Sequence, residues 1–445
     1  MKILVDHGAY DNFGDLAMLQ AAMDRLRQVE GAELHVQESP LVWRRSNVHT
    51  VGYHVPLPDP VLHRKLRARV KNRLLRRGLR LATSAWRNRL YNGVGRGNSI
   101  GAQLIQTGTS QSVIARWCAD YDALFIAGGG DMNDVFPQAL WRCCALIHAF
   151  ADQNKPILLS GQQLGPMRHP ASVRLLHSAL RRVTFVSVRE PTESVRILLE
   201  AGVDRARMAM TGDDSLGIAP AEASEVGRLL EALDVAPGNF IAVNIRMGPY
   251  TTVSPRHLRE VAGLVGQVSR DLNLPLLAVP ISVDEGDSDI ASARLMEAQL
   301  GRRLRILDRA SLSAALLKGV LGSAHAAIGM SYHFATFALC QGVPAIALYV
   351  GDYYEQKAKG LSAFWGDQRL ALSIEDLAKN PAANACATFT DPSLRGHLRA
   401  RASEATSAWE DCFAKRIVLP LRTLTSERPD RSVPSQASST AADIL

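Results

Sequence analysis

A chain of 445 residues is too long for one compact core, and with 47% hydrophobic and 21% charged residues it is too apolar to be disordered. Two soluble domains are therefore expected. The net charge of +8 arises between residues 61 and 96, where twelve Lys and Arg and no Asp or Glu leave an acidic remainder.

The amino-terminal residues enter a predicted strand directly and do not have the arrangement of a secretory signal, so we expect a cytoplasmic protein. No apolar run approaches the roughly 18 residues that would span a bilayer. The six cysteines lack the paired C-x-x-C spacing of a zinc site. Neither a metal nor a cofactor is indicated.

Short apolar runs alternate with segments of helical period in the first half, a pattern typical of βα units in a parallel sheet. Predicted strands cover residues 2–6, 33–37, 123–127, 156–161, 183–188 and 207–211. Predicted helices cover residues 16–29, 139–153, 171–182 and 192–201. A Rossmann-like domain is therefore expected over residues 1–220.

The turn after the first strand contains Asn12-Phe13-Gly14-Asp15 just before a predicted helix. Asp15 can cap that helix by accepting backbone N–H bonds. Because the turn also lies at a strand carboxyl end, Asn12 and Asp15 can instead hold a sugar hydroxyl, with Asp15 as the base. The two interpretations are compatible.

The basic segment 61–96 combines its cations with an apolar stripe at four-residue spacing. The stripe consists of Leu62, Leu66, Val70 and Leu74. Such a helix suits an anionic membrane surface, so the inner face of the cell membrane is a possible peripheral location. The alternative is a linker helix whose stripe packs on its own domain. Nucleic acid is not expected, because two aromatics and no known module are present.

Polar loops follow the next predicted strands. Gly128-Gly129-Gly130-Asp131 allows a backbone to approach a ligand closely or to turn tightly, and residues 160–166 form a second polar loop on the same rim. Arg189 and Glu190 follow another strand, where an ion pair that fixes the loop is expected. Thr211-Gly212-Asp213-Asp214 indicates hydrogen bonding to hydroxyls more than a metal site.

A second series of strands and helices follows a helical connection at residues 219–238. Strands are predicted at 240–245, 274–280, 304–307, 326–329 and 345–350, with helices at 255–271, 288–300, 311–321 and 333–341. This predicts a second Rossmann-like domain over residues 236–365, an amphipathic helix within 390–425 and a disordered tail over 426–445. Two doubly wound α/β domains would face a central cleft.

Polar residues also follow strands of this second domain. Arg246 ends the first strand, and its planar fork suits a carboxylate or phosphate. We expect Arg246→Ala to weaken binding of an anionic donor with little change in stability. Ser331-Tyr332-His333 joins a strand to a helix, which places His333 among backbone N–H groups that can accept an anion. Lys357 follows the last strand.

Together, the Asn12–Asp15 turn, the glycine loop, residues 187–194, residues 329–333, Gly342-Val343-Pro344 and residues 353–357 resemble the polysaccharide pyruvyl transferase family in order and spacing. The match runs from about residue 2 to residue 360. The resemblance implies a fold like that of the GT-B glycosyltransferases. It also implies transfer of a pyruvyl group from phosphoenolpyruvate to a sugar of a cell-surface or lipid-linked glycan, forming a ketal and releasing phosphate.

The resemblance also assigns roles to residues. His333 and Asp15 would be the catalytic acid and base. Donor-binding roles fall to Arg246, Ser331, Tyr332 and Lys357, and acceptor-binding roles to Asn12, Gly129, Gly130, Asp131 and Arg189.

The chain departs from the family at one position. The family commonly shows Arg-Leu-His where this chain has Ser331-Tyr332-His333, so a donor-binding cation is missing at Ser331. Arg246, Lys357 or Lys359 would have to replace it. Two alternatives therefore stay open: a GT-B glycosyltransferase that uses a nucleotide sugar, and a non-catalytic sugar-binding relative.

Overall fold

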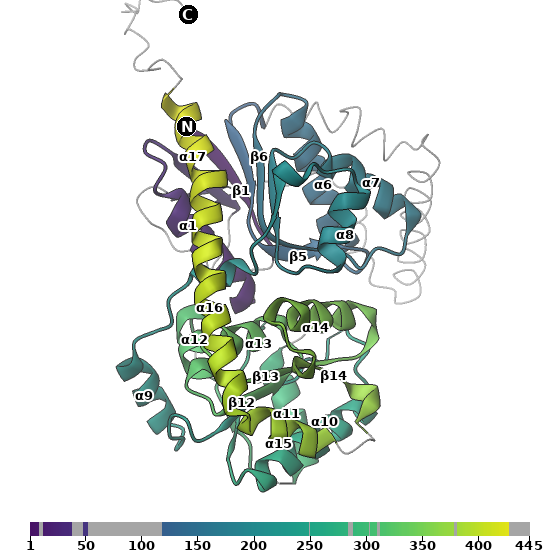
Figure 1. Cartoon of the computed structure of the whole chain (residues 1–445), viewed down its shortest axis with the longest axis vertical. Helices are drawn as coiled ribbons and strands as arrows, with labels where there is room; N and C mark the ends of the chain where they lie inside the picture. The colour runs from purple at the N-terminus through teal and green to yellow at the C-terminus, as the bar shows by residue number, and fades with distance from the viewer. Residues whose placement is uncertain are drawn as a thin grey trace, which may run out of the picture.

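The computed structural model describes residues 1–8, 12–37, 48–51, 118–248, 250–283, 288–301, 303–308, 312–377 and 381–426. It contains two parallel α/β domains, one above the other in Figure 1. The basic segment 61–96 and residues 427–445 of the expected tail lie outside the described residues. Within the described ranges, no helix is both long and apolar enough to cross a membrane.

The first domain is built on a parallel sheet with the strand order β3-β2-β1-β4-β6-β7-β8, and β5 pairs with β6. The strands are β1 (Lys2–Asp6), β2 (Glu33–Gln37), β3 (Val48–Val51), β4 (Ala123–Ile126), β5 (Gly129–Met132), β6 (Ile157–Leu164), β7 (Phe185–Val188) and β8 (Met208–Met210). The helices between them include α1 (Phe13–Leu26), α6 (Pro137–Ala151), α7 (Pro170–Leu180) and α8 (Glu193–Glu200). Strands β1, β4 and β6 lie centrally in the sheet, and their apolar side chains are buried, as expected of a parallel sheet covered on both faces.

The second domain has the strand order β11-β10-β9-β12-β13-β14. Its strands are β9 (Ile241–Asn244), β10 (Leu276–Ala278), β11 (Arg305–Ile306), β12 (Ala326–Gly329), β13 (Ala345–Tyr349) and β14 (Ala371–Ser373). The described helices are α9 (Ala223–Glu231), α10 (Pro255–Asp271), α11 (Asp289–Leu300), α12 (Ala314–Gly322), α13 (Tyr332–Leu339), α14 (Gly351–Trp365) and α15 (Pro381–Thr390). Both sheets have the doubly wound order, in which successive strands are added first to one side and then to the other side of a central strand, β1 or β9.

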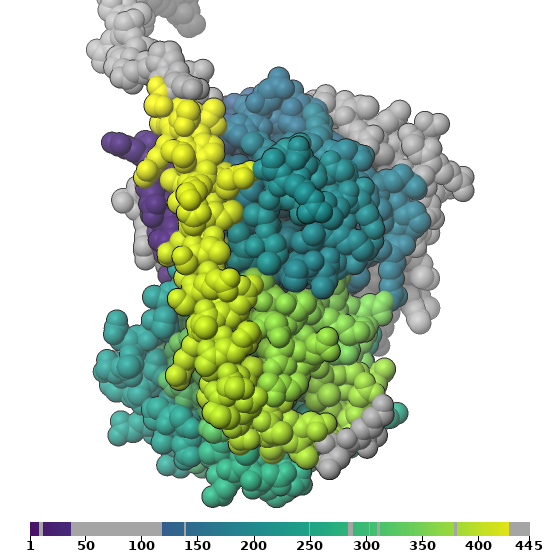
Figure 2. All heavy atoms as spheres, in the orientation of Figure 1, coloured from purple at the N-terminus to yellow at the C-terminus, as the bar shows by residue number. Residues whose placement is uncertain are grey.

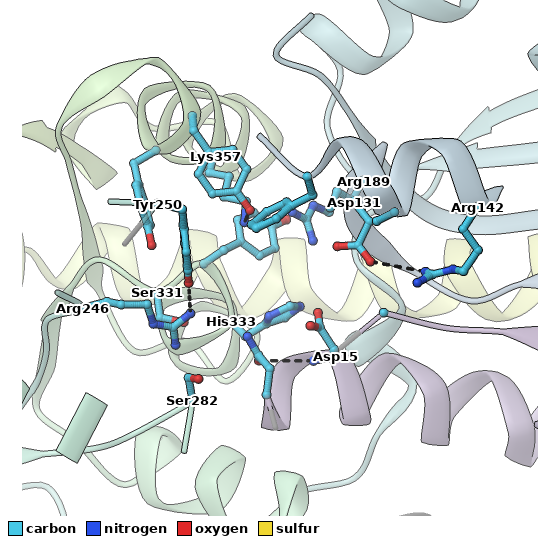
Figure 3. Close-up of a pocket in the computed structure, with 18 residues that line it drawn as sticks. Asp15, Asp131, Arg142, Arg189, Arg246, Tyr250, Ser282, Ser331, His333 and Lys357 are labelled. Atoms are coloured by element: carbon cyan, nitrogen blue, oxygen red, sulfur yellow. Dashed lines mark hydrogen bonds and ion pairs between the residues drawn. The ribbon is translucent and has the colours of Figure 1, made fainter. Parts of the chain in front are cut away.

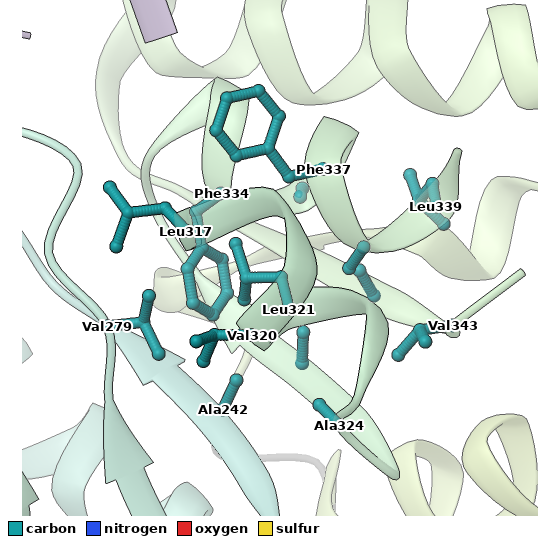
Figure 4. Packing of buried hydrophobic residues seen from close by; sticks show 14 of the residues in the cluster. Ala242, Val279, Leu317, Val320, Leu321, Ala324, Phe334, Phe337, Leu339 and Val343 are labelled. Carbon is teal, nitrogen blue, oxygen red and sulfur yellow. The ribbon is translucent and has the colours of Figure 1, made fainter. Parts of the chain in front are cut away.

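The core of the second domain fixes the helix that follows β12. Phe334 and Phe337 of α13 are fully buried and pack with Leu317 and Val320 of α12 over one face of the sheet (Figure 4). Burial of two aromatic side chains contributes several kcal/mol and anchors α13 at its first turn. The side chains at the beginning of α13 therefore have a defined position at the sheet edge.

A long carboxyl-terminal helix joins the two domains. Helix α16 (Pro392–Phe413) continues through a π-helical turn into α17 (Leu419–Ser426) and runs along both domains in Figures 1 and 2. Leu394 and Leu398 are buried in the core of the second domain, whereas Trp409 and Phe413 belong to a core cluster of the first. The predicted amphipathic helix thus buries its apolar stripe against two different domains.

Several elements differ from the sequence-based expectation. The second sheet includes β14, beyond residue 365, where the sequence placed the end of that domain. Gly129 and Gly130, predicted as a loop, begin β5, because this segment pairs with the end of β6. Helix α14 was not predicted, since Gly351 and Gly360 lower its helix propensity. Tertiary pairing and burial outweigh these local preferences.

Candidate active site

A cavity of about 340 Å³ lies between the two domains and is lined by residues of both (Figure 3). From the first domain come Gly8, Asn12, Asp15, Gly130, Asp131, Phe136, Ala139, Arg142 and Arg189. From the second come Arg246, Tyr250, Ser282, Ser331, Tyr332, His333, Tyr353, Tyr354 and Lys357. Many of these residues follow the carboxyl ends of parallel strands, where ligands bind in such sheets. The cavity therefore unites most of the residues to which the resemblance assigned roles, whereas residues 160–166, expected on the same rim, do not line it.

Gly129 is the predicted site residue that does not line this cavity. It pairs with Gln162 at the start of β5, and the next glycine, Gly130, is the one that faces the cavity. A Cβ at Gly130 would lie 3.1 Å from the Arg189 guanidinium. Gly130 therefore allows Arg189 to reach the cavity wall.

Asp15 lies within the first turn of α1 and is not its cap. Asn12 is the N-cap residue, and its Oδ1 accepts hydrogen bonds from Gly14 N at 2.9 Å and from Asp15 N at 3.4 Å. The Asp15 carboxyl group is therefore left for the cavity, where Figure 3 shows it beside His333. Burial raises the pKa of Asp15 to about 6, against the opposing influence of His333.

His333 lies in the first turn of α13 and is almost completely buried. Its Nε2 lies 3.4 Å from Oδ2 of Asp213, a residue of the first domain. Burial alone would raise the pKa of Asp213, but His333 and Arg189 outweigh that effect and hold it well below its usual range. An ionised carboxylate therefore lies beside the imidazole.

Arg189 also pairs with Asp213, at 3.2 Å between Nη1 and Oδ2, and not with Glu190 as the sequence suggested. Glu190 instead accepts backbone N–H bonds from Thr192 at 2.7 Å and Ser194 at 2.6 Å, ahead of α8. Its orientation follows from the positive end of that helix. The Arg189 guanidinium lies 3.9 Å from the centre of the Tyr332 ring, a cation–π contact between the two domains.

Arg142 of α6 is a cavity residue that sequence reasoning missed. Its Nε donates to Asp6 at 3.2 Å, and its Nη2 lies 3.8 Å from Asp131 (Figure 3). Burial raises the pKa of Asp131, although Arg142 opposes that effect. No motif marks Arg142 in the sequence. Its helical position, one turn beyond the cavity-lining Ala139, is the only signal, and it depends on knowing which face of α6 meets the cleft.

Arg246 is held by a bidentate ion pair with buried Asp289, at 2.8 Å from Nε to Oδ1 and 3.0 Å from Nη2 to Oδ2. Its Nη1 donates to the Tyr250 hydroxyl at 3.2 Å. Asp289 also accepts hydrogen bonds from the backbone N–H groups of Ile281 and Ser282 at 2.8 and 2.9 Å. Arg246 therefore has a structural role in addition to its place in the cavity wall.

Ser331, the position at which the chain departs from the family pattern, is the N-cap residue of α13. Its backbone N–H donates to Asn244 at 3.1 Å, and its side chain makes no capping bond to α13. Arg246 and Lys357 line the cavity and can supply a cation there. Lys359 does not line it; its side chain is 60% exposed and pairs with Glu355.

Lys357 of α14 belongs to an aromatic wall that sequence reasoning did not foresee. Its Nζ bonds the Tyr353 hydroxyl, and burial, followed by the charge of Arg189, lowers the pKa of Lys357 to about 7. Phe136 of the first domain makes edge contacts with Tyr250 at 5.3 Å and Tyr353 at 5.6 Å between ring centres. These rings meet only because the two domains face each other, which periodicity along one chain does not reveal.

Comparison with known proteins places these observations in a family. The family model described as polysaccharide pyruvyl transferase matches residues 12–353, most of the chain. A comparison with curated proteins finds no significant match.

Among solved structures, the chain is similar to a putative UDP-N-acetylglucosamine 2-epimerase from Listeria monocytogenes, with a TM-score of 0.56 and 14% identity over 96% of this chain and 97% of that one. S. aureus MnaA, in a structure with UDP, matches with a TM-score of 0.56 and 13% identity over 96% and 98%. The calicheamicin glycosyltransferase CalG4 matches with a TM-score of 0.50 and 14% identity over 96% and 99%. At these identities the likeness shows the fold, which is that of GT-B glycosyltransferases and epimerases.

Proposed function

The chain belongs to the polysaccharide pyruvyl transferase family, and we propose that it transfers a pyruvyl group from phosphoenolpyruvate to a sugar of a cell-surface or lipid-linked glycan. One observation supports this most: cationic side chains of both domains share a cavity with two half-buried carboxyl groups, Asp15 and Asp131, and an imidazole. An anionic donor needs such cations, and transfer to a hydroxyl needs an acid and a base.

The reaction balances without a redox partner. A proton adds to the methylene carbon, and one sugar hydroxyl attacks the adjacent carbon. The bond from that carbon to the phosphate oxygen then breaks, and a second hydroxyl completes the ketal. Of the two hydroxyl protons, one ends on the new methyl group and the other on the departing phosphate. The chemistry therefore requires proton transfer and charge stabilisation only.

His333 is the proposed acid, because it lines the cavity with an ionised carboxylate, Asp213, beside it. A carboxylate in this position stabilises the charged imidazole and orients its ring. Asp15 is the proposed base for the attacking hydroxyl. A base whose pKa lies near 6 is ionised at neutral pH and still basic enough to accept a proton.

The cations have separate proposed roles. Arg246 and Lys357, from the second domain, would hold the carboxylate and phosphate of the donor, with Ser331 and Tyr332 beside them. Asn12, Gly130, Asp131 and Arg189, from the first domain, would contact the acceptor. Gly129 takes no direct part, because Gly130 is the glycine at the cavity wall.

The test compares donors on the intact protein. Calorimetry with phosphoenolpyruvate should show binding, and incubation with phosphoenolpyruvate and candidate glycans should release phosphate and add one pyruvyl ketal to the glycan mass. Binding of UDP or a UDP-sugar, with no binding of phosphoenolpyruvate, would instead support the nucleotide-sugar alternative. Binding of glycan without turnover of either donor would support a non-catalytic relative.

We also propose peripheral contact with an anionic membrane through residues 61–96, which would bring the enzyme to a lipid-linked acceptor. The support is the sequence alone: dense positive charge with an apolar stripe. A cytoplasmic location at the inner face of the membrane would follow.

A further inference from the structure

Two motifs on different domains form one contact. Gly14 lies in the first turn of α1, and His333 lies in the first turn of α13. A Cβ built on Gly14 would lie 1.9 Å from Nδ1 and 2.0 Å from Cγ of His333. No side chain larger than hydrogen fits at this position, so the imidazole ring rests against bare backbone.

Asp213 approaches the same ring at its Nε2 atom, at 3.4 Å. Asp213 is itself fixed, because Oδ1 accepts a bond from Ser215 N at 2.9 Å and Oδ2 accepts one from Arg189 at 3.2 Å. The Nε2 atom of His333 has no hydrogen-bond partner among the described residues. The contact is longer than an ordinary hydrogen bond, as catalytic hydrogen bonds often are in the absence of substrate.

Gly14 and Asp213 therefore both contact the ring from the first domain, whereas His333 belongs to the second. Two hydrogen bonds also join the domains: Phe13 N donates to Ile281 O at 2.9 Å, and Gln356 Nε2 donates to Leu164 O at 2.7 Å. The imidazole has this environment only when the domains are closed.

We propose that domain closure completes the catalytic acid: Gly14 receives the imidazole ring of His333, and Asp213 is the positioning residue that orients it. With Nε2 directed at Asp213, Nδ1 is left for proton transfer to substrate. Proton transfer is thereby restricted to the closed enzyme, where water has less access to the intermediate. The catalytic part of this proposal rests on the proposed pyruvyl transfer.

The first test adds one methyl group at the contact. Gly14→Ala should lower kcat by about 10²-fold, the effect expected when an acid is displaced. Gly263→Ala is the matched control, because Gly263 is also a helical glycine and an added Cβ there meets nothing within 4 Å. The control should keep wild-type kcat. Wild-type kcat in Gly14→Ala would overturn the proposal.

Asp213→Asn tests the orienting charge and keeps the shape of the side chain. We expect the fold decrease in kcat to exceed the fold increase in the dissociation constant of phosphoenolpyruvate by at least about tenfold. The reason is that the acid is misaligned while the donor-binding cations of the second domain stay in place. Equal changes in both quantities would mean that Asp213 only maintains the fold, and would overturn its positioning role.

A third measurement does not depend on turnover. In small-angle scattering of the unliganded protein, Gly14→Ala should increase the radius of gyration, since the domains cannot close on the added methyl group. Adding His333→Ala to Gly14→Ala should restore the wild-type radius, because the clash is removed. If wild type transfers no pyruvyl group, the proposed function fails and this pair of variants still decides the contact. An unchanged radius in Gly14→Ala would then overturn it.

Discussion

At the scale of single residues, Arg246 illustrates how the structure changes a sequence-based expectation. The sequence predicted that its removal would weaken donor binding and leave stability unchanged. Arg246 is, however, the bidentate partner of Asp289, whose side chain is 1% exposed. Removing one member of a buried ion pair leaves the other charge uncompensated.

We therefore expect Arg246→Ala to lower the free energy of unfolding by about 3 kcal/mol and also to weaken phosphoenolpyruvate binding. Urea unfolding and calorimetry measure the two effects. Arg256→Ala is the control, since that arginine pairs with Glu260 at the surface and its side chain is 74% exposed. The control should leave stability nearly unchanged, because solvent screens an exposed ion pair. Unchanged stability in Arg246→Ala would contradict the structural role.

His333→Gln tests the acid itself. The amide can still donate a hydrogen bond, so phosphoenolpyruvate should bind nearly as in wild type, but the amide cannot deliver a proton at neutral pH. Turnover should fall by roughly 10²-fold or more, the usual scale for a lost acid or base. Near-normal turnover, measured with the donor saturating, would restrict His333 to binding.

The pH dependence of kcat/KM should report two further residues. Asp15 must be ionised to act as a base, so activity should rise as pH passes its pKa of about 6. Lys357 must keep its proton to hold the donor, so activity should fall as pH passes its pKa of about 7. A bell-shaped profile with a narrow maximum follows. In Lys357→Arg the part of the alkaline limb that Lys357 contributes should disappear, because arginine stays charged. An unchanged alkaline limb in that variant would exclude Lys357 as its source.

At the scale of elements, Asp214 links the carboxyl-terminal helix to the first sheet. Its Oδ1 accepts a hydrogen bond from Trp409 Nε1 at 2.8 Å, and its Oδ2 accepts bonds from Ser160 Oγ and from Gly128 N. Burial raises the pKa of Asp214 from its ordinary 3.8 to about 7. The folded protein thus holds this proton over a range in which the unfolded chain has released it.

The stability that Asp214 contributes is fully present below its unfolded pKa and is lost as pH rises to its folded pKa. Relative to Asp214→Asn, the free energy of unfolding of wild type should fall by about 1.4 kcal/mol per pH unit between pH 4 and 7. Urea unfolding of both proteins at several pH values in that window gives the difference. Asparagine can cost stability by losing the Gly128 bond, but that cost does not vary with pH. Parallel pH curves for the two proteins would exclude a protonated Asp214.

Local sequence patterns predicted most elements because βα units alternate in period along the chain. They failed where an element depends on pairing or contacts between distant segments. Gly129 and Gly130 form a strand because β6 continues beside them, and α14 forms although it contains two glycines. The candidate site shows the same division: residues at strand ends were found, whereas Arg142 and Phe136 of the α6 region were not. Their relevance appears only when one domain faces the other.

At the scale of the whole molecule, the charge distribution predicts where the protein is found. Residues 61–96 carry twelve cations and no acid, so binding should be tighter to anionic vesicles than to neutral ones and should weaken as salt rises. Replacing Arg76 and Arg77 by Gln should weaken that binding by about fivefold for each charge, since one surface cation contributes about 1 kcal/mol. Vesicle sedimentation measures this. Equal binding to both kinds of vesicle would favour the linker interpretation.

The path of the carboxyl-terminal helix has a consequence for how the protein is made. Trp409, Phe413, Ile417 and Leu421 complete the core that surrounds Ile3 and Phe125 near the other end of the chain. A ribosome releases amino-terminal segments first, and domains commonly fold as they emerge. Here the first domain cannot close its apolar face until α16 and α17 have been synthesised, so we expect the nascent chain to expose that face until late in translation.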